Sequence, residues 1–423
     1  PRRLFCEQDR GLAGQRARDR DALLLAAGQL VRHAAGLAGE PDHLERVGDG
    51  LLDEPARLAD DLERERDVVV DRLARQQPEV LEDDAEVAPE VRDLAARHGG
   101  ELLAEDVDLA VAAANRAKNA WKNTYVGERA NLLCKLGAII AEHAEELVPM
   151  ETAQYGGPVS KTRNFDIPAA VGEFELMAGM GRSVTGNTIT ADPLARIMTL
   201  REPFGVCGLI TPWNFPLVTA VSKLGPALIT GNTVVLKPPS CAPLTVLKMG
   251  EYAIEAGFPA GVINIVAGPG SEVGEAIVNH RDVNKISFTG DSHVGKRIME
   301  LASRQVKSVA SELGGKNAMI VLDDAELDNA VEAATYAAFF NSGQNCGSPS
   351  RFYVQEGIYD AFVSRFVKAA GKIIVGDPTD PKTMMGPLAY NACLDTAERF
   401  IESAKKAGSR VLLGGERPTT ADM

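Results

Sequence analysis

The stretch VCGLITPWNFPLVTAVSKLGPALITGNTVVLK, residues 206–237, decides the fold of this chain. Short apolar segments at 206–211 and 233–237 flank a helix-favouring run at 218–230. A strand, a helix and a second strand in this order form the repeating unit of a parallel sheet. The alternation continues with apolar segments at 262–266 and 285–289 and with helical runs at 243–256, 271–280 and 293–303. We therefore expect an α/β fold built on a parallel, doubly wound, Rossmann-like sheet.

Polar and small residues follow the predicted strands. In a doubly wound sheet, ligands bind beyond the carboxyl ends of the strands. The residues at these positions are Trp213, Asn214, Lys237, Ser240, Gly268, Gly270 and Gly290. We expect them to surround a ligand site.

Two glycine-rich segments are near matches to nucleotide-binding loops. GPGSEVG, residues 268–274, is one residue longer than the usual dinucleotide fingerprint. GDSHVGKR, residues 290–297, has Arg297 where a phosphate-binding loop needs Ser or Thr to hold magnesium. Each segment alone is equally compatible with an ordinary helix start. Both lie in one predicted sheet and precede a thiol and a carboxylate, which favours a nucleotide cofactor beside a covalent catalyst.

The thiol belongs to Cys346 in FFNSGQNCGSPSR, residues 339–351, a turn rich in Gly, Ser and Asn. A thiol in such a turn is accessible and close to backbone N–H groups, which favours the thiolate, although a lone cysteine is more often a small core residue. Upstream, SELGGKNAMIVLDDAELD places Glu312 just before a Gly-Gly turn. A thiol and a separate carboxylate suggest covalent catalysis with a general base.

Composition and charge argue against several other functions. The net charge of −14 disfavours nucleic-acid binding, which needs a basic face. The apolar runs are shorter than the roughly 20 residues that a membrane helix requires, so we expect no membrane association. The six cysteines show neither paired spacing nor a zinc-binding cluster, so we predict no metal site and a reducing compartment, the cytoplasm. Outside the first 104 residues the histidines are His143, His280 and His293. So few histidines argue against a catalytic Cys/His pair.

Residues 1–104 differ from the rest of the chain. They contain no Lys, Asn, Ile, Met, Ser, Thr, Tyr or Trp, and their 24 acidic and 15 basic residues give a net charge of −9 out of the total of −14. Ser and Thr are needed for helix caps and turns, and too few aromatic residues remain to build a core. We predict a disordered leader here; an acidic interaction arm is the alternative.

Two folded regions are expected after this leader. Residues 105–315 form the predicted cofactor-binding domain, and residues 316–423 form part of a second α/β domain, the predicted catalytic domain. The second region is expected to contain strands at 319–322, 352–355 and 411–413 and helices at 327–340, 359–373 and 391–407.

Five segments from about residue 105 onward resemble, in order, the signature motifs of the NAD(P)-dependent aldehyde dehydrogenase superfamily. They are PFGVCGLITPWNFPL, GNTVVLKPPS, ISFTG, SELGGKNAMIVLDDAELD and FFNSGQNCGSPSR. Five motifs in the family's order argue strongly against chance agreement. The resemblance implies oxidation of a small-molecule aldehyde to a carboxylic acid with NAD or NADP, through a cysteine thiohemiacetal and thioester.

The resemblance also implies roles for individual residues. Cys346 matches the nucleophile, and Asn214 matches the amide that stabilises the oxyanion together with the backbone N–H of Cys346. Glu312 matches the general base that activates water, and Lys223 a lysine tied to the catalytic water and proton path. The implied cofactor-binding residues are Thr211, Trp213, Lys237, Ser240, Gly270, Gly274, Gly290 and Leu313.

The chain departs from the family pattern at two cofactor positions. Ser240 stands where NAD-preferring members commonly carry a glutamate, and a hydroxyl does not repel a 2′-phosphate, so NADP is expected to be tolerated. Asp291 stands where a serine usually follows FTG, which places a carboxylate near the cofactor pyrophosphate. This carboxylate should weaken cofactor binding unless it points away or meets Lys296.

The chain also lacks parts of the family pattern. It stops at Met423, before the later motif whose glutamate holds the nicotinamide ribose and before the strand used in the family's homodimers and homotetramers. We therefore expect little or no turnover, and the alternative function is that of an inactive fragment acting as a binding or interaction polypeptide. Among enzymes, the acyl-CoA-forming members are the alternative, but they tend to lack a base at the position of Glu312.

Overall fold

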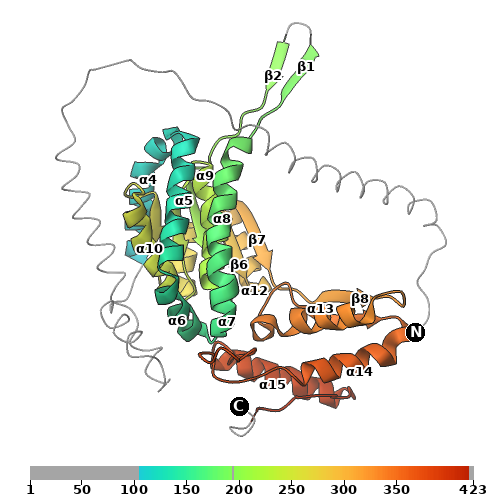
Figure 1. Ribbon diagram of the computed structural model, residues 1–423. Helices are drawn as coiled ribbons and strands as arrows, with labels where there is room; N and C mark the ends of the chain where they lie inside the picture. Colours follow the sequence, from blue (N-terminus) through green and yellow to red (C-terminus); the bar gives the residue numbers. More distant parts are fainter. Residues whose placement is uncertain (1–103, 193–194, 419–423) are drawn as a thin grey trace, which may run out of the picture. The chain divides into compact units, whose positions relative to one another are not determined.

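The computed structural model of the chain describes residues 104–192 and 195–418 (Figure 1). The prediction of a disordered leader lies, apart from Ala104, outside the described residues. The helices are α4 (Ala104–Asn123), α5 (Val126–Glu142), α6 (Ala144–Tyr155), α7 (Val159–Lys161), α8 (Ile167–Met180), α9 (Pro216–Ile229), α10 (Leu244–Ala256), α11 (Glu275–Asn279), α12 (Ser292–Ser303), α13 (Leu327–Phe339), α14 (Tyr359–Ala370) and α15 (Asn391–Lys406). The strands are β1 (Thr188–Asp192), β2 (Ala195–Met198), β3 (Val206–Ile210), β4 (Thr233–Lys237), β5 (Ile263–Ile265), β6 (Lys285–Gly290), β7 (Ser308–Leu313), β8 (Asn317–Val321) and β9 (Pro349–Val354).

Strands β3 to β7 form one parallel sheet in the order β5-β4-β3-β6-β7. The chain moves outward from β3 in one direction, returns, and continues from β6 in the other, so the topological switch point lies between β3 and β6. The expected doubly wound α/β sheet is thus confirmed. The sequence reading missed β7, because its residues SVASEL are mostly exposed and form no apolar run.

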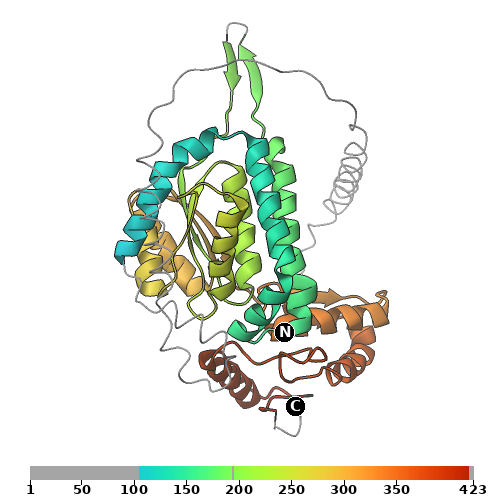
Figure 2. The same cartoon turned by 60° about the vertical axis from the view of Figure 1, so that its left-hand side comes forward.

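Helices cover both faces of this sheet. Successive side chains of a strand point to opposite faces, and on β3 both sets are apolar. On β3, Cys207 and Leu209 pack into a core shared with α5, α8, α9 and α10. Val206 and Ile210 point to the opposite face, into a core shared with α4, α11 and α12. Figure 2 shows the two groups of helices on either side of the strands. Because both faces are buried, the strands read as continuous apolar segments, which made them recognisable in the sequence.

Strands β1 and β2 form an antiparallel hairpin, in which Ile189 pairs with Ile197 (Figure 1).

Strands β8 and β9 form a separate parallel pair that packs against α13 and α14. Val321, Val331 and Phe362 are the centre of this smaller core. The strand predicted at 411–413 is wrong: these residues form no strand, and their side chains are about half exposed. Three apolar residues in a row without a pairing partner do not make a strand.

Within the described residues, no helix is long and apolar enough to cross a membrane.

Candidate active site

The carboxyl ends of four strands meet at one edge of the sheet. Ile210 of β3 is aligned with Lys237 of β4 and with Phe288 of β6, and Gly290 of β6 is aligned with Leu313 of β7. This register places Lys237, Gly290 and Leu313, three of the residues predicted to bind the cofactor, at the same edge, although 76 positions of the sequence separate the first from the last. In a parallel doubly wound sheet this edge is where ligands bind.

Lys237 is buried at this edge and organises the residues around it. The backbone N–H and the hydroxyl of Thr211 both donate to Lys237 O, at 3.1 and 3.3 Å. Lys237 Nζ donates to Pro238 O at 3.0 Å and to Ser240 Oγ at 3.4 Å, and Ser240 Oγ donates to Gly268 O at 2.9 Å. Burial lowers the pKa of Lys237 to about 8, an effect that the nearby Cys241 opposes. The lysine, the serine and the glycine loop thus form one connected unit.

The loop with residues 268–274 runs directly beside Lys237. Gly268 has φ 146°, a conformation that favours glycine, and residues Gly270–Gly274 form a single turn that leads into α11. A Cβ on Gly274 would lie 3.6 Å from Lys237 Cδ, whereas a Cβ on Gly270 would meet no atom within 4 Å. The loop therefore leaves open space over Gly270.

Asp291 does not extend its carboxylate freely into this space. It caps α12: its Oδ1 accepts a hydrogen bond from the backbone N–H of His293 at 2.7 Å. The carboxylate thus satisfies one of the free N–H groups at the start of the helix. The side chain of Leu313 lies against Gly295 of the same helix, where a Cβ would come within 2.5 Å of Leu313 Cδ2.

Asn214 connects the sheet edge to the loop that carries the thiol. Asn214 Nδ2 donates to Gln344 O at 2.8 Å, and Asn214 O accepts from Asn341 Nδ2, also at 2.8 Å. Gln344 lies two residues before Cys346. The neighbouring Trp213 meets Tyr390 edge to face, with ring centroids 5.5 Å apart.

The backbone of the thiol loop has an uncommon conformation. Asn341, Ser342 and Gly343 have φ values of 55°, 57° and 74°, in the left-handed region that non-glycine residues rarely adopt. Two side-chain hydrogen bonds stabilise this turn. Asn341 Nδ2 donates to Asn214 O, and Ser342 Oγ donates to Gly386 O at 3.1 Å. The turn leaves Cys346 exposed, and Asn317 Nδ2 donates to Cys346 O at 2.6 Å.

Asn317 and Asn341 were missed by the sequence analysis. The available signal was the Asn-Ser-Gly triplet at 341–343, because asparagine and glycine are the residues that most readily take a left-handed conformation.

Lys223 and Glu312 lie within electrostatic reach of each other. Burial lowers the pKa of Lys223 to about 8, and the negative charge of Glu312 opposes this shift. Lys223 Nζ donates to Ser287 Oγ at 3.0 Å. Glu312 is exposed on β7, and in the described part of the chain no hydrogen bond joins it to Cys346.

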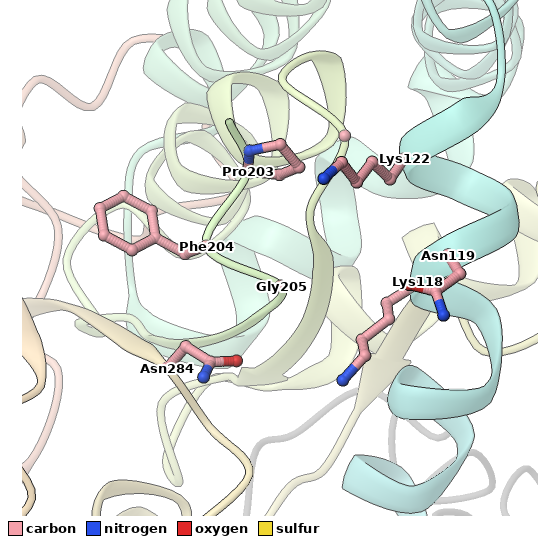
Figure 3. Close-up of a pocket in the computed structure, with 8 residues that line it drawn as sticks. Lys118, Asn119, Lys122, Pro203, Phe204, Gly205 and Asn284 are labelled. Atoms are coloured by element: carbon pink, nitrogen blue, oxygen red, sulfur yellow. The ribbon is translucent and has the colours of Figure 1, made fainter. Parts of the chain in front are cut away.

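A hollow of about 200 Å³ lies elsewhere, between Lys118 and Lys122 of α4 and the segment 203–205 (Figure 3). Gly205 and Asn284 directly precede β3 and β6, so this hollow lies at the amino ends of the strands, opposite the edge described above. Both ammonium groups already have partners: Lys118 donates to Asn115 Oδ1 at 2.8 Å, and Lys122 pairs with Glu202 at 3.1 Å. The candidate site residues do not line it.

Residues 91–422 match the sequence profile of the aldehyde dehydrogenase family. The chain is 42% identical over 313 residues to a mitochondrial aldehyde dehydrogenase from Leishmania tarentolae, covering 74% of this chain and 63% of that protein. It is 45% identical over 314 residues to human retinaldehyde dehydrogenase 3, covering 73% of this chain and 61% of that protein. The chain thus spans about three fifths of the length of the curated relatives it matches.

A solved structure of the NAD+ complex of an aldehyde dehydrogenase from Bacillus cereus resembles this fold with a TM-score of 0.74. The two sequences are 41% identical, and the match covers 75% of this chain and 65% of that one. Within the described residues, no group of three or more His, Cys, Asp or Glu side chains is placed to hold a metal ion.

Proposed function

Because the chain belongs to the aldehyde dehydrogenase family, we propose that it carries the thiol and cofactor site of an NAD(P)-dependent oxidation of an aldehyde to a carboxylic acid. One observation carries the proposal: the Asn214 amide, at the ligand-binding edge of the sheet, is hydrogen-bonded to the loop of the exposed Cys346. This hydrogen bond joins an amide donor to Gln344, two residues before the exposed thiol.

Cys346 is the proposed nucleophile. Its thiolate forms a C–S bond to the aldehyde carbon, and the carbonyl electron pair moves to oxygen to give a thiohemiacetal. Asn214 Nδ2 carries two hydrogens; one is donated to Gln344 O, which leaves the other for the developing oxyanion, together with the backbone N–H of Cys346. Loss of hydride from the thiohemiacetal carbon gives the thioester.

Glu312 is the proposed base for the second half of the reaction. Its carboxylate takes a proton from water, which attacks the thioester carbon and releases the carboxylic acid and the Cys346 thiol. Lys223 lies close enough to Glu312 to belong to the path by which that proton leaves. An acyl-CoA product is disfavoured, because a base at this position directs the thioester to water.

The chemistry of the sheet edge supports a dinucleotide. Lys237 and Ser240 offer an ammonium and a hydroxyl for ribose hydroxyls, and Gly270 leaves space for close approach of phosphate. The remaining groups proposed to line the site are Thr211, Trp213, Gly274, Gly290 and Leu313. When bound, the nicotinamide supplies the acceptor for the hydride. The hydroxyl of Ser240 carries no charge that would select NAD over NADP.

One finer expectation belongs to the proposal. A thiol nucleophile requires a reducing compartment, and the cytoplasm remains our expectation.

The test is reduction of NAD+ or NADP+ by the full 423-residue chain with a panel of aliphatic and aromatic aldehydes. We expect Cys346→Ser to abolish any reduction, whereas Cys134→Ser, which removes an exposed thiol on α5, should preserve it. Reduction that survives Cys346→Ser would overturn the proposal. Absence of reduction with every aldehyde would agree with the little or no turnover expected from the sequence and would favour the alternative function, that of an inactive fragment.

A further inference from the structure

A buried cluster of charged side chains lies beside the turn that carries Asn214, and none of the steps above uses it. Glu151 on α6 and Asp166 before α8 are fully buried, and Lys161 on α7 is 8% exposed. Lys161 Nζ donates to Asp166 Oδ2 at 2.8 Å and to the Tyr155 hydroxyl at 2.5 Å. Removing charges from water is costly unless their geometry compensates, so the location of this cluster requires an explanation.

Glu151 holds the first turn of α9. Its Oε1 accepts a hydrogen bond at 3.2 Å from the backbone N–H of Leu217, three residues after Asn214. Its Oε2 accepts from Gln154 Nε2 at 2.6 Å and from the hydroxyl of Thr245 on α10. One carboxylate therefore ties the start of α9 to both α6 and α10, using an N–H group that has no partner inside its own helix.

Lys161 contacts the residue directly after Asn214. Its Nζ lies 4.1 Å from the centroid of the Phe215 ring, a cation–π geometry. The Phe215 ring stacks on Phe340, with centroids 6.1 Å apart and an interplanar angle of 26°. Phe340 directly precedes the left-handed turn that leads to Cys346. The cluster thus contacts both the Asn214 turn and the segment that begins the thiol loop.

We propose that Glu151, together with Lys161, is a positioning residue that fixes the Asn214 amide relative to the Cys346 loop for oxyanion stabilisation. Asp166 and Tyr155 hold Lys161 in place. The inference rests on the proposed function, in which Asn214 donates to the oxyanion. Its physical basis is that a displacement of about 1 Å at such a donor can cost on the order of a hundredfold in rate.

Two reactions of Cys346 in the full chain distinguish a loss of Asn214 positioning from a general loosening of the fold. Acylation by p-nitrophenyl acetate forms a C–S bond at a carbonyl, passes through an oxyanion and expels p-nitrophenolate. Alkylation by iodoacetamide forms a C–S bond at a saturated carbon, expels iodide and develops no oxyanion. Neither reaction needs the nicotinamide cofactor. The ratio of the two rate constants therefore reports on oxyanion stabilisation alone, and a loosened or partly unfolded site would change both.

We expect Glu151→Met to lower the acylation rate about tenfold or more, with alkylation changed less than about twofold. Glu151→Gln retains an oxygen that can accept from Leu217 N–H, so it should keep acylation within about threefold of the unmodified chain. If Glu151→Met does not fold, Thr245→Val removes a donor to the same carboxylate and should lower the ratio about threefold. An unchanged ratio in Thr245→Val would then overturn the proposal.

Arg129→Met is the matched control. Arg129 is also buried, and its Nε donates to Ile229 O at 3.1 Å, at the opposite end of α9 from Glu151. This variant should destabilise the protein without lowering the ratio of acylation to alkylation. An equal drop of the ratio in Arg129→Met and Glu151→Met would contradict positioning by Glu151.

Asn214→Ala distinguishes the two proposals. If it leaves acylation unchanged, the proposed role of Asn214 fails, and the inference fails with it. If it slows acylation, Glu151→Met should add little in the Asn214→Ala background, because both changes remove the same interaction. Fully additive losses would overturn the positioning role and leave the proposed function intact.

Discussion

The sheet of β3 to β7 and the strand pair β8–β9 are both parallel, but they bury their side chains differently. Every residue of β3 and β4 is buried, between helices on both faces. In β8, Val321 is buried, whereas Ile320 exposes 71% of its surface and Tyr353 of β9 exposes 53%. Strands β3 and β4 are packed against helices on both faces, so their side chains are shielded from solvent. The pair β8–β9 is packed on one face, so the stability of this pair depends on that face alone.

The two regions also treat their thiols differently. Cys207 lies inside β3, where burial raises its pKa to about 12. Cys346 lies outside regular structure and is exposed. The sheet thus holds a buried thiol, and the loop between α13 and β9 holds an accessible one. This difference in burial predicts which thiols should react and which substitutions should destabilise the protein.

The largest expected effect is a difference in thiol reactivity between the two regions. Burial raises the pKa of Cys207 to about 12 and that of Cys241 to about 11. Because the thiolate is the reactive form, Cys207 should react with iodoacetamide roughly a thousandfold more slowly than an ordinary thiol. Peptide mapping after brief alkylation should find Cys346 labelled and Cys207 and Cys241 unlabelled. Cys134, exposed on α5, provides the rate of an accessible thiol, and faster labelling of Cys207 than of Cys346 would contradict the contrast.

One substitution in the core and one at an exposed position test the difference in burial directly. Leu236 in β4 is fully buried, so Leu236→Ala should lower the free energy of unfolding by about 2–5 kcal/mol. Ile320→Ala in β8 removes the same class of side chain from an exposed position and should change it by less than about 0.5 kcal/mol. Urea denaturation followed by circular dichroism measures both. Equal losses would mean that the outer face of β8 is covered in solution.

Glu312 lies in β7, the last strand before the second region, and its proposed role can be tested without the cofactor. Glu312→Gln should preserve the initial burst of p-nitrophenol from p-nitrophenyl acetate and lower steady-state release about a hundredfold, because only hydrolysis of the thioester needs the base. Stopped-flow absorbance separates the two phases. Glu332→Gln, on the exposed side of α13, is the matched control. Loss of the burst would assign Glu312 to activation of the thiol instead.

The buried cluster beside α9 should give the first region a specific pH dependence. Burial, with the Asp166 charge as a second cause, raises the pKa of Glu151 to about 7. The folded state then binds this proton more tightly than the unfolded state does, so stability is higher in acid and falls as the pH rises through about 7. In Glu151→Gln this decline should be smaller, by at most about 2.5 kcal/mol between pH 5 and pH 8. Parallel stability curves for the two proteins would show that Glu151 does not titrate in this range.

The smallest expected effect concerns cofactor choice at the sheet edge. Ser240→Glu introduces a carboxylate beside Lys237, which repels a 2′-phosphate, so the ratio of NADP to NAD affinity should fall about tenfold, or 1.4 kcal/mol. Calorimetric titration with each dinucleotide measures the ratio. Ser240→Gln matches the size without the charge and should leave the ratio unchanged. A similar fall in both variants would point to size rather than charge.

The sequence by itself determined the doubly wound sheet, four of its five strands (β3, β4, β5 and β6) and the family resemblance. Segments such as 234–236 are apolar throughout because both faces of the strand are buried, and this signal depends only on residues next to one another in the sequence. The five motifs likewise lie within single stretches of chain, so their residues could be named before any fold was known.

Only the tertiary structure decided which of these residues meet. Strand β7 has no local apolar signal, so its place beside β6 followed only from sheet pairing. The position of Glu312 near Lys223 follows from this pairing together with the packing of α9, from which Lys223 Nζ donates to Ser287 Oγ of β6. The contact of Glu151 with the first turn of α9 joins residues 66 positions apart. A hydrogen bond of this kind depends on the spatial approach of distant segments, and the local pattern around a buried carboxylate does not reveal its partner.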